Sequence, residues 1–355
     1  MREIFETTIE RILVDHVTPA LFRECAAGAW PDALWTTLED AEVTCAAVPE
    51  LFGGSGASWE DTFTLIRAAG AHAVPAPFAD TLLANWLMAR AGVAPAKRPA
   101  AIAALSQLTD SNGQYSGRLE KIPWGRDLKR IVAVAAEPAR LVVLDTASAV
   151  SIERGCNLAG EPRDTVTFDR ARPVAVAPLP DDATHAFLLL CGAMIRSAQM
   201  AGALQSILQM TTAYATERVQ FGKPIGHFQV IQQQIAVLAE HTACSLIAAE
   251  AAFAESTADI AALPIMAAKI CVGEAASIGA STAHAVHGAI GFTDEHTLHL
   301  KTRRLWAWRA EYGSQAYWSQ RLGRAVCESG ARALWPTLTQ TATLIPIPAA
   351  REIHT

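Results

Sequence analysis

The sequence predicts a multi-domain α+β chain that is mainly α-helical. We expect an N-terminal all-helical domain over residues 1–98, a small middle β-barrel over residues 99–182 and a C-terminal four-helix bundle over residues 183–340, with a tail at residues 341–355. Three observations predict this order. Apolar residues recur at helical spacing first, short β-branched stretches follow, and a helical period returns beyond Pro180.

The N-terminal domain is predicted from stretches in which apolar residues lie three and four positions apart. These stretches are residues 4–13, 31–43, 57–74 and 81–92. The segment Pro49–Ser58 is rich in glycine and serine, which is typical of a loop between two helices.

The middle domain is predicted from β-branched stretches that lie roughly ten residues apart. They are residues 130–135, 140–145, 147–152 and 164–169. This spacing favours a small antiparallel barrel or sandwich. Because no strand is followed by a glycine-rich turn and a helix, a dinucleotide-binding parallel sheet is not expected.

The C-terminal bundle is predicted from long apolar faces. Met194, Ala198 and Ala201 step by four and three positions, which places them on one face of a helix from about Ala183 to Val219. Further helices are expected through Ile231, Ile235 and Leu238, and over about 260–287 and 294–329. Four long antiparallel helices form a bundle.

Composition excludes several classes of protein. A net charge of -6 with scattered basic residues gives no surface for nucleic acid. The longest apolar run, Ala186–Ile195, is short of the ~20 residues of a membrane span, so we expect no membrane insertion and a cytoplasmic location. The cysteines form no CxxC pair, and the histidine pairs 284/287 and 296/299 have no nearby ligands, so no metal site is expected.

Specific motifs lie at the ends of the predicted bundle helices. They are ERVQFGKPIGHFQ at Glu217–Gln229 and HGAIGFTDEHTLHL at His287–Leu300, supported by PELFGGSG at 49–56 and IPWGRD at 122–127. With the helix, barrel and bundle order, they make nearly the whole chain resemble the acyl-CoA dehydrogenase family.

The resemblance implies an FAD cofactor and names the residues that contact it. In the family, the positions of Arg218, Gln220 and Phe221 contact the pyrophosphate and adenosine end of a flavin seated mainly in a neighbouring subunit. A guanidinium suits phosphate oxygens, and a planar ring suits the flat surfaces of the cofactor. The remaining implied cofactor-binding residues are Gln229, His287, Gly288, Ala289 and Ser314, of which His287, Gly288 and Ala289 resemble the family's HGGxG turn.

The resemblance does not extend to the catalytic base. Family members remove the α-proton of an acyl-CoA thioester with a glutamate while the flavin accepts the β-hydrogen as hydride, which gives a 2-enoyl-CoA. The two family positions for that glutamate align with Tyr312 and Gly192. Glu311 is a weak candidate, because one residue on a helix is a rotation of ~100°. We therefore assign no catalytic residue and keep Glu311 as a candidate.

The position of the family's flavin-ring loop, Ala104–Gly117, is also poorly matched. Some bacterial members are assembled from two different chains, several of which act on steroid or other bulky thioesters. We therefore expect this chain to complete the FAD site of a homologous acyl-CoA dehydrogenase subunit that supplies the base, in a heterotetramer. The alternatives are a homotetrameric dehydrogenase that uses Glu311, a flavin monooxygenase or nitroalkane-type oxidase on the same scaffold, and a catalytically silent scaffold subunit.

Overall fold

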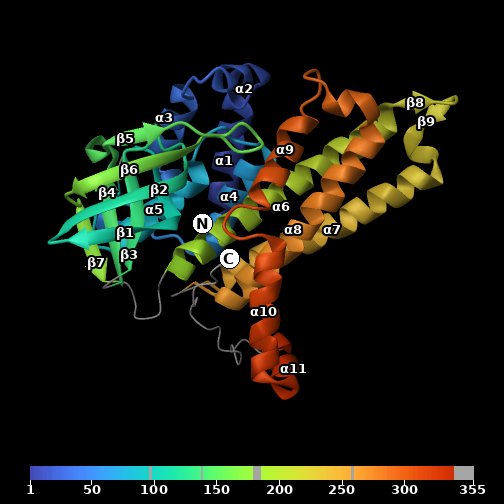
Figure 1. The fold of residues 1–355 in the computed structure, drawn as a ribbon. Helices are drawn as coiled ribbons and strands as arrows, with labels where there is room; N and C mark the ends of the chain where they lie inside the picture. Colours follow the sequence, from blue (N-terminus) through green and yellow to red (C-terminus); the bar gives the residue numbers. More distant parts are fainter. Residues whose placement is uncertain (96–97, 137–138, 179–184, 257–259, 340–355) are drawn as a thin grey trace.

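The computed structural model describes residues 1–95, 98–136, 139–178, 185–256 and 260–339. A β-sheet lies at one end of the molecule and a bundle of long helices extends to the other end (Figure 1). The N-terminal helices pack against both, because the largest hydrophobic core joins residues of these helices to the sheet and to the bundle.

The N-terminal part is helical, as predicted. Its helices are α1 (Arg2–His16), α2 (Pro19–Ala26), α3 (Asp32–Asp40), α4 (Trp59–Ala71) and α5 (Phe78–Arg90), with single 3-10 turns at Val43–Cys45 and Glu50–Phe52. The sequence did not predict α2, a helix of eight residues in which no side chain is fully buried.

The middle part is a seven-stranded sheet in the order β5-β6-β2-β1-β3-β4-β7. The strands are β1 (Ala100–Ser111), β2 (Gln114–Pro123), β3 (Arg130–Ala136), β4 (Ala139–Asp145), β5 (Ser151–Glu153), β6 (Arg163–Ala171) and β7 (Ala175–Pro178). Neighbouring strands are antiparallel except β1 and β3, which are parallel.

The prediction of a barrel was wrong, since the sheet is not closed. β1 shifts its register between Ile102 and Gln107 and pairs with β3 on one side and β2 on the other. The edge strands β5 and β7 have only three and four residues and do not pair with each other. Strands this short present too few backbone groups to join the two edges. The predicted loop at Ala104–Gly117 is the β1–β2 hairpin, which turns at Asn112 and Gly113.

The C-terminal part contains the predicted long helices. They are α6 (His185–Glu217), α7 (Gln229–Ala254) and α8 (Ala262–His287), followed by α9 (Leu298–Trp308), α10 (Gln315–Ser329) and α11 (Ala331–Thr339). The single helix predicted over 294–329 is wrong, because the chain breaks between α9 and α10. Tyr312 and Gly313 have φ angles of 53° and 88°, which a continuous α-helix does not contain.

Helices α4 and α6 cross where glycines let their backbones touch. A Cβ on Gly70 would lie 1.9 Å from the carbonyl oxygen of Gln199, which is backbone and cannot move aside. We predict that Gly70→Ala lowers the free energy of unfolding by about 1–3 kcal/mol or more. Gly323→Ala is the control, because this exposed glycine within α10 has open space around it and alanine favours a helix by about 0.5–1 kcal/mol. Thermal denaturation of both variants tests this, and equal melting temperatures would contradict it.

Among the residues that the structure describes, three helices are long and apolar enough to cross a membrane by length and composition, namely α6, α7 and α8. The longest uninterrupted apolar run did not reveal them, because single polar residues interrupt each one. For α6, 89% of the most apolar window is buried inside the protein, whereas for α7 only 28% is buried. Val230, Val237 and Ile247 are among the exposed apolar residues of α7.

Candidate functional site

The segment after α6 forms a tight hairpin at the end of the bundle farthest from the sheet (Figure 1). Strand β8 (Val219–Gln220) pairs with β9 (Lys223–Pro224), and the amide of Ile225 donates a 2.8 Å hydrogen bond to the carbonyl of Arg218. Phe221 and Gly222 form the turn, with φ angles of 52° and 79°. Such a turn holds Phe221 in a conformation that costs a non-glycine residue energy, and its side chain is 92% exposed.

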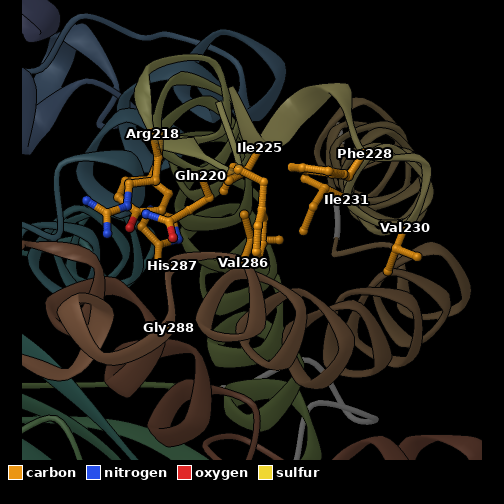
Figure 2. Close-up of a pocket in the computed structure, with 11 residues that line it drawn as sticks. Arg218, Gln220, Ile225, Phe228, Val230, Ile231, Val286, His287 and Gly288 are labelled. Carbon is orange, nitrogen blue, oxygen red and sulfur yellow. The ribbon is translucent and has the colours of Figure 1, made fainter. Parts of the chain in front are cut away.

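A cleft of about 470 Å³ lies between this hairpin and the end of α8 (Figure 2). Five of its lining residues are predicted cofactor contacts: Arg218, Gln220, Phe221, His287 and Gly288. Within the residues that the structure describes, the Arg218 guanidinium has no ion pair or side-chain hydrogen bond. The cleft therefore combines a free cation with apolar and aromatic walls.

His287 is the buried polar group of this cleft. Its Nδ1 donates a 2.8 Å hydrogen bond to the carbonyl of Ala283, so its Nε2 is an acceptor in the neutral ring, and that atom is buried without a partner. The ring stacks on Tyr214 with centroids 4.6 Å apart. Burial lowers the pKa of His287, which favours the neutral ring. A ligand that donates a hydrogen bond, such as a ribose hydroxyl, would satisfy Nε2.

The other predicted cofactor residues do not line the cleft. Gln229 starts α7, and Ala289 lies exposed in the 3-10 turn after α8 (Gly288–Phe292). Ser314 caps α10 by accepting a hydrogen bond from the amide of Tyr317. Six further residues line the cleft and were not predicted as cofactor contacts: Tyr214, Ile225, Phe228, Val230, Ile231 and Val286. Tyr214 precedes Arg218 by one helical turn, and that spacing could have identified it.

A second polar centre lies inside the molecule, where the domains meet. We call it the central ionic cluster: Asp80, Arg196, Glu311, Arg163, Glu161 and Arg304. Acidic and basic side chains alternate along it. Arg196 joins Asp80 at 3.1 Å to Glu311 at 2.8 Å, and Arg163 joins Glu311 at 2.9 Å to Glu161 at 3.0 Å.

Glu311 lies at the centre of this cluster, and both of its carboxylate oxygens accept two hydrogen bonds. Its Oε1 accepts from Arg163 Nε and Asn157 Nδ2, each at 2.9 Å, and its Oε2 accepts from Arg163 Nη2 and Arg196 Nε at 3.0 and 2.8 Å. A carboxylate has about four acceptor positions, so none remains for a substrate proton. Burial raises the pKa of Glu311, but the charges of Arg163 and Arg196 outweigh burial and hold this pKa far below its usual range. This environment disfavours Glu311 as a base.

The two positions that align with the family's glutamate touch each other. Tyr312 packs directly on Gly192, and its hydroxyl donates a 3.1 Å hydrogen bond to Asp80. Burial raises the pKa of Tyr312 well above its usual value, so the phenol stays protonated. Neither position carries a carboxylate.

We predict that Gly192→Ala destabilises the chain by about 1–3 kcal/mol, because overpacking a buried contact has this cost. A Cβ at this position would lie 2.3 Å from the Tyr312 ring. Adding Tyr312→Ala to the same chain removes the clash, so the double variant should lose less stability than the two single losses summed. Melting temperatures of the three variants measure this coupling, and simple additivity would contradict the contact.

The guanidinium group of Arg163 lies over the ring of Trp124, the aromatic residue of IPWGRD. The guanidinium carbon of Arg163 lies 5.2 Å from the centre of its ring. A cavity of about 310 Å³ remains nearby, and Arg126, Glu161 and Arg304 are among its lining residues. Trp124 itself, Phe22 and Trp30 also line this cavity, so charged and aromatic side chains share it. Within the described residues, no group of three or more His, Cys, Asp or Glu side chains could hold a metal ion.

Comparison with known proteins gives consistent matches. Residues 188–326 match the family model described as acyl-CoA dehydrogenase, C-terminal domain. Acyl-CoA dehydrogenase IpdE2 of Mycobacterium tuberculosis is 28% identical over 85% of this chain and 90% of that protein. Acyl-CoA dehydrogenase FadE34 of the same organism is 30% identical over 93% of this chain, which spans only 47% of FadE34. The crystal structure of the ChsE4-ChsE5 complex from Mycobacterium tuberculosis superposes with a TM-score of 0.83 at 21% identity, over 93% of this chain and 98% of that one.

Proposed function

Because this chain belongs to the acyl-CoA dehydrogenase family, we propose that it is one subunit of a two-chain, FAD-dependent enzyme that desaturates acyl-CoA thioesters. In this proposal the Arg218 hairpin completes the FAD site of a homologous partner chain. The partner supplies the catalytic base and the surface for the flavin ring. The product is a 2-enoyl-CoA, and the enzyme is an oxidoreductase.

One distance carries the proposal. Arg196, in the central ionic cluster, and Glu217, just before the hairpin, are both in α6 and lie ~30 Å apart at 1.5 Å per residue. The five-carbon ribityl chain of FAD cannot join a ring at Trp124, beside that cluster, to a diphosphate at Arg218. This distance supports a cleft that serves a flavin whose ring lies on another chain.

The residues of the cleft fit the diphosphate and adenosine end of FAD. A guanidinium without a partner can donate two parallel hydrogen bonds to phosphate oxygens. His287 Nε2 offers a buried acceptor, while Tyr214 and Phe228 supply flat apolar surface for an adenine ring. These side chains bind and orient the cofactor and exclude water from its diphosphate.

The flavin, when bound, supplies hydride acceptance, and a carboxylate must take the α-proton. This chain provides no such carboxylate at either family position, since Gly192 and Tyr312 occupy them and Glu311 is saturated by its donors. A homomeric enzyme that uses Glu311 is therefore disfavoured. Two comparisons support a two-chain enzyme. FadE34 is about twice as long as this chain, so a single FadE34 chain has room for two units of this size. The ChsE4-ChsE5 structure is a complex of two different chains.

The proposal is tested by purifying this chain alone and together with a homologous acyl-CoA dehydrogenase subunit from the same organism. We expect the lone chain to be colourless, and the complex to show a flavin spectrum and to oxidise an acyl-CoA. Stoichiometric flavin and thioester oxidation by the lone chain would contradict the two-chain enzyme. A complex without flavin would indicate the alternative of a catalytically silent scaffold subunit.

A further inference from the structure

The central ionic cluster joins the N-terminal helices, the sheet and the C-terminal helices. Asp80 comes from α5, Glu161 from the segment before β6, Arg163 from the first position of β6, and Arg196 from α6. Arg304 lies in α9, and Glu311 lies between α9 and α10. The six side chains carry three negative and three positive charges, so the cluster is neutral as a whole.

The cluster occupies the position at which related enzymes would hold reacting groups. It surrounds the contact between Gly192 and Tyr312, the two positions of the family's base, because Asp80 binds the Tyr312 hydroxyl and Arg196 binds Glu311. It also covers Trp124, since Arg163 lies over the indole ring. On the face of Trp124 that Arg163 covers, a flavin ring would have to displace a buried guanidinium from two carboxylates.

The backbone that presents Glu311 is held in place by dedicated contacts. Tyr312 and Gly313 both have positive φ angles, which is a strained turn for tyrosine. The buried Lys269 of α8 donates to the carbonyls of Trp308, Arg309 and Gly313 at 3.2, 2.9 and 3.0 Å. Trp318 Nε1 donates to the Tyr312 carbonyl at 3.0 Å. The turn is therefore fixed from both sides.

We propose that the central ionic cluster takes the place of the flavin ring and the acyl thioester at this chain's own centre. Its ion pairs bond the N-terminal helices, the sheet and the bundle directly to one another. They lie between Trp124 and the contact of Gly192 with Tyr312, so the chain acts through its hairpin. This inference deepens the proposed function and rests on it for the location of the active centre.

The first test is the stability of the lone chain. Glu311→Leu leaves Arg163 and Arg196 each without one acid partner, so its melting temperature should fall clearly. The double variant Arg163→Met/Glu311→Leu removes an adjacent acid and base and leaves the pairs Arg196–Asp80 and Arg304–Glu161 complete. Its melting temperature should recover most of the loss. The control is Glu120→Gln, which breaks an exposed pair with Arg118 and should change nothing.

The second test uses riboflavin, which has the flavin ring but neither phosphate nor adenosine. A ligand that binds the folded chain raises its melting temperature, and we expect no rise with the wild-type chain. A rise with riboflavin, or a Glu311→Leu variant as stable as wild type, would overturn the inference. The stability comparison of the Glu311 variants involves neither the Arg218 cleft nor a partner chain, so this inference and the proposed function can fail separately.

Discussion

Replacing Arg218 with alanine should weaken FAD binding by the two-chain complex about 10- to 100-fold. A hydrogen bond to a charged group contributes about 1.5–3 kcal/mol, and about 1.4 kcal/mol corresponds to a tenfold change in affinity. The variant should fold normally, because Arg218 is exposed and, among the described residues, its guanidinium contacts no acidic side chain. Flavin fluorescence released during dilution of the complex measures the affinity.

Two further variants make this prediction specific. Arg218→Lys keeps the charge but loses the planar fork that binds two phosphate oxygens, so an intermediate loss is expected. Arg172→Ala removes an exposed arginine beside the sheet, far from the hairpin, and should bind FAD like the wild type. Equal FAD affinity for Arg218→Ala and Arg172→Ala would show that the hairpin does not contact the cofactor.

Replacing Glu311 with glutamine should destabilise the chain without abolishing turnover by the complex. Removing one partner of a buried ion pair costs about 3–5 kcal/mol, and we expect the lower end because Arg163 and Arg196 keep Glu161 and Asp80. The complex assembled from folded Glu311→Gln chains should retain its turnover per flavin. A base role for Glu311 predicts the opposite, which is a stable protein with no activity.

The pH dependence of stability gives a second readout for Glu311. Because the folded-state pKa of its carboxyl is lowered, its contribution is fully present above the unfolded pKa of about 4.3 and is lost as the pH falls through the lower folded-state pKa. The difference in melting temperature between wild type and Glu311→Gln should therefore be large at pH 7 and shrink towards pH 3. A difference that stays constant over this range would mean that Glu311 is not held as a charged group.

The helices could be predicted from the sequence because each buries one face and so has an apolar period. The open sheet could not, because closure depends on the lengths of β5 and β7 and on the register of β1, and none of these has a local signal. The break at Tyr312 was missed for a similar reason. Lys269 of α8 stabilises that turn, and it lies more than a whole helix away in the sequence.

The hairpin could be located from the sequence because Arg218, Gln220 and Phe221 are adjacent to each other and to turn-forming glycine and proline. The central ionic cluster could not be located, because its members lie between Asp80 and Glu311 and meet only in the folded chain. The empty base positions at Gly192 and Tyr312 were visible in the sequence. The ionic side chains that surround these two positions could not be identified from the sequence.

A structure of this chain bound to its partner subunit and FAD tests the central claim most directly. The account predicts that the Arg218 guanidinium lies within hydrogen-bonding distance of the pyrophosphate of an FAD whose ring rests on the other chain. An Arg218 side chain that faces bulk water, remote from the subunit boundary and from the dinucleotide, would contradict it.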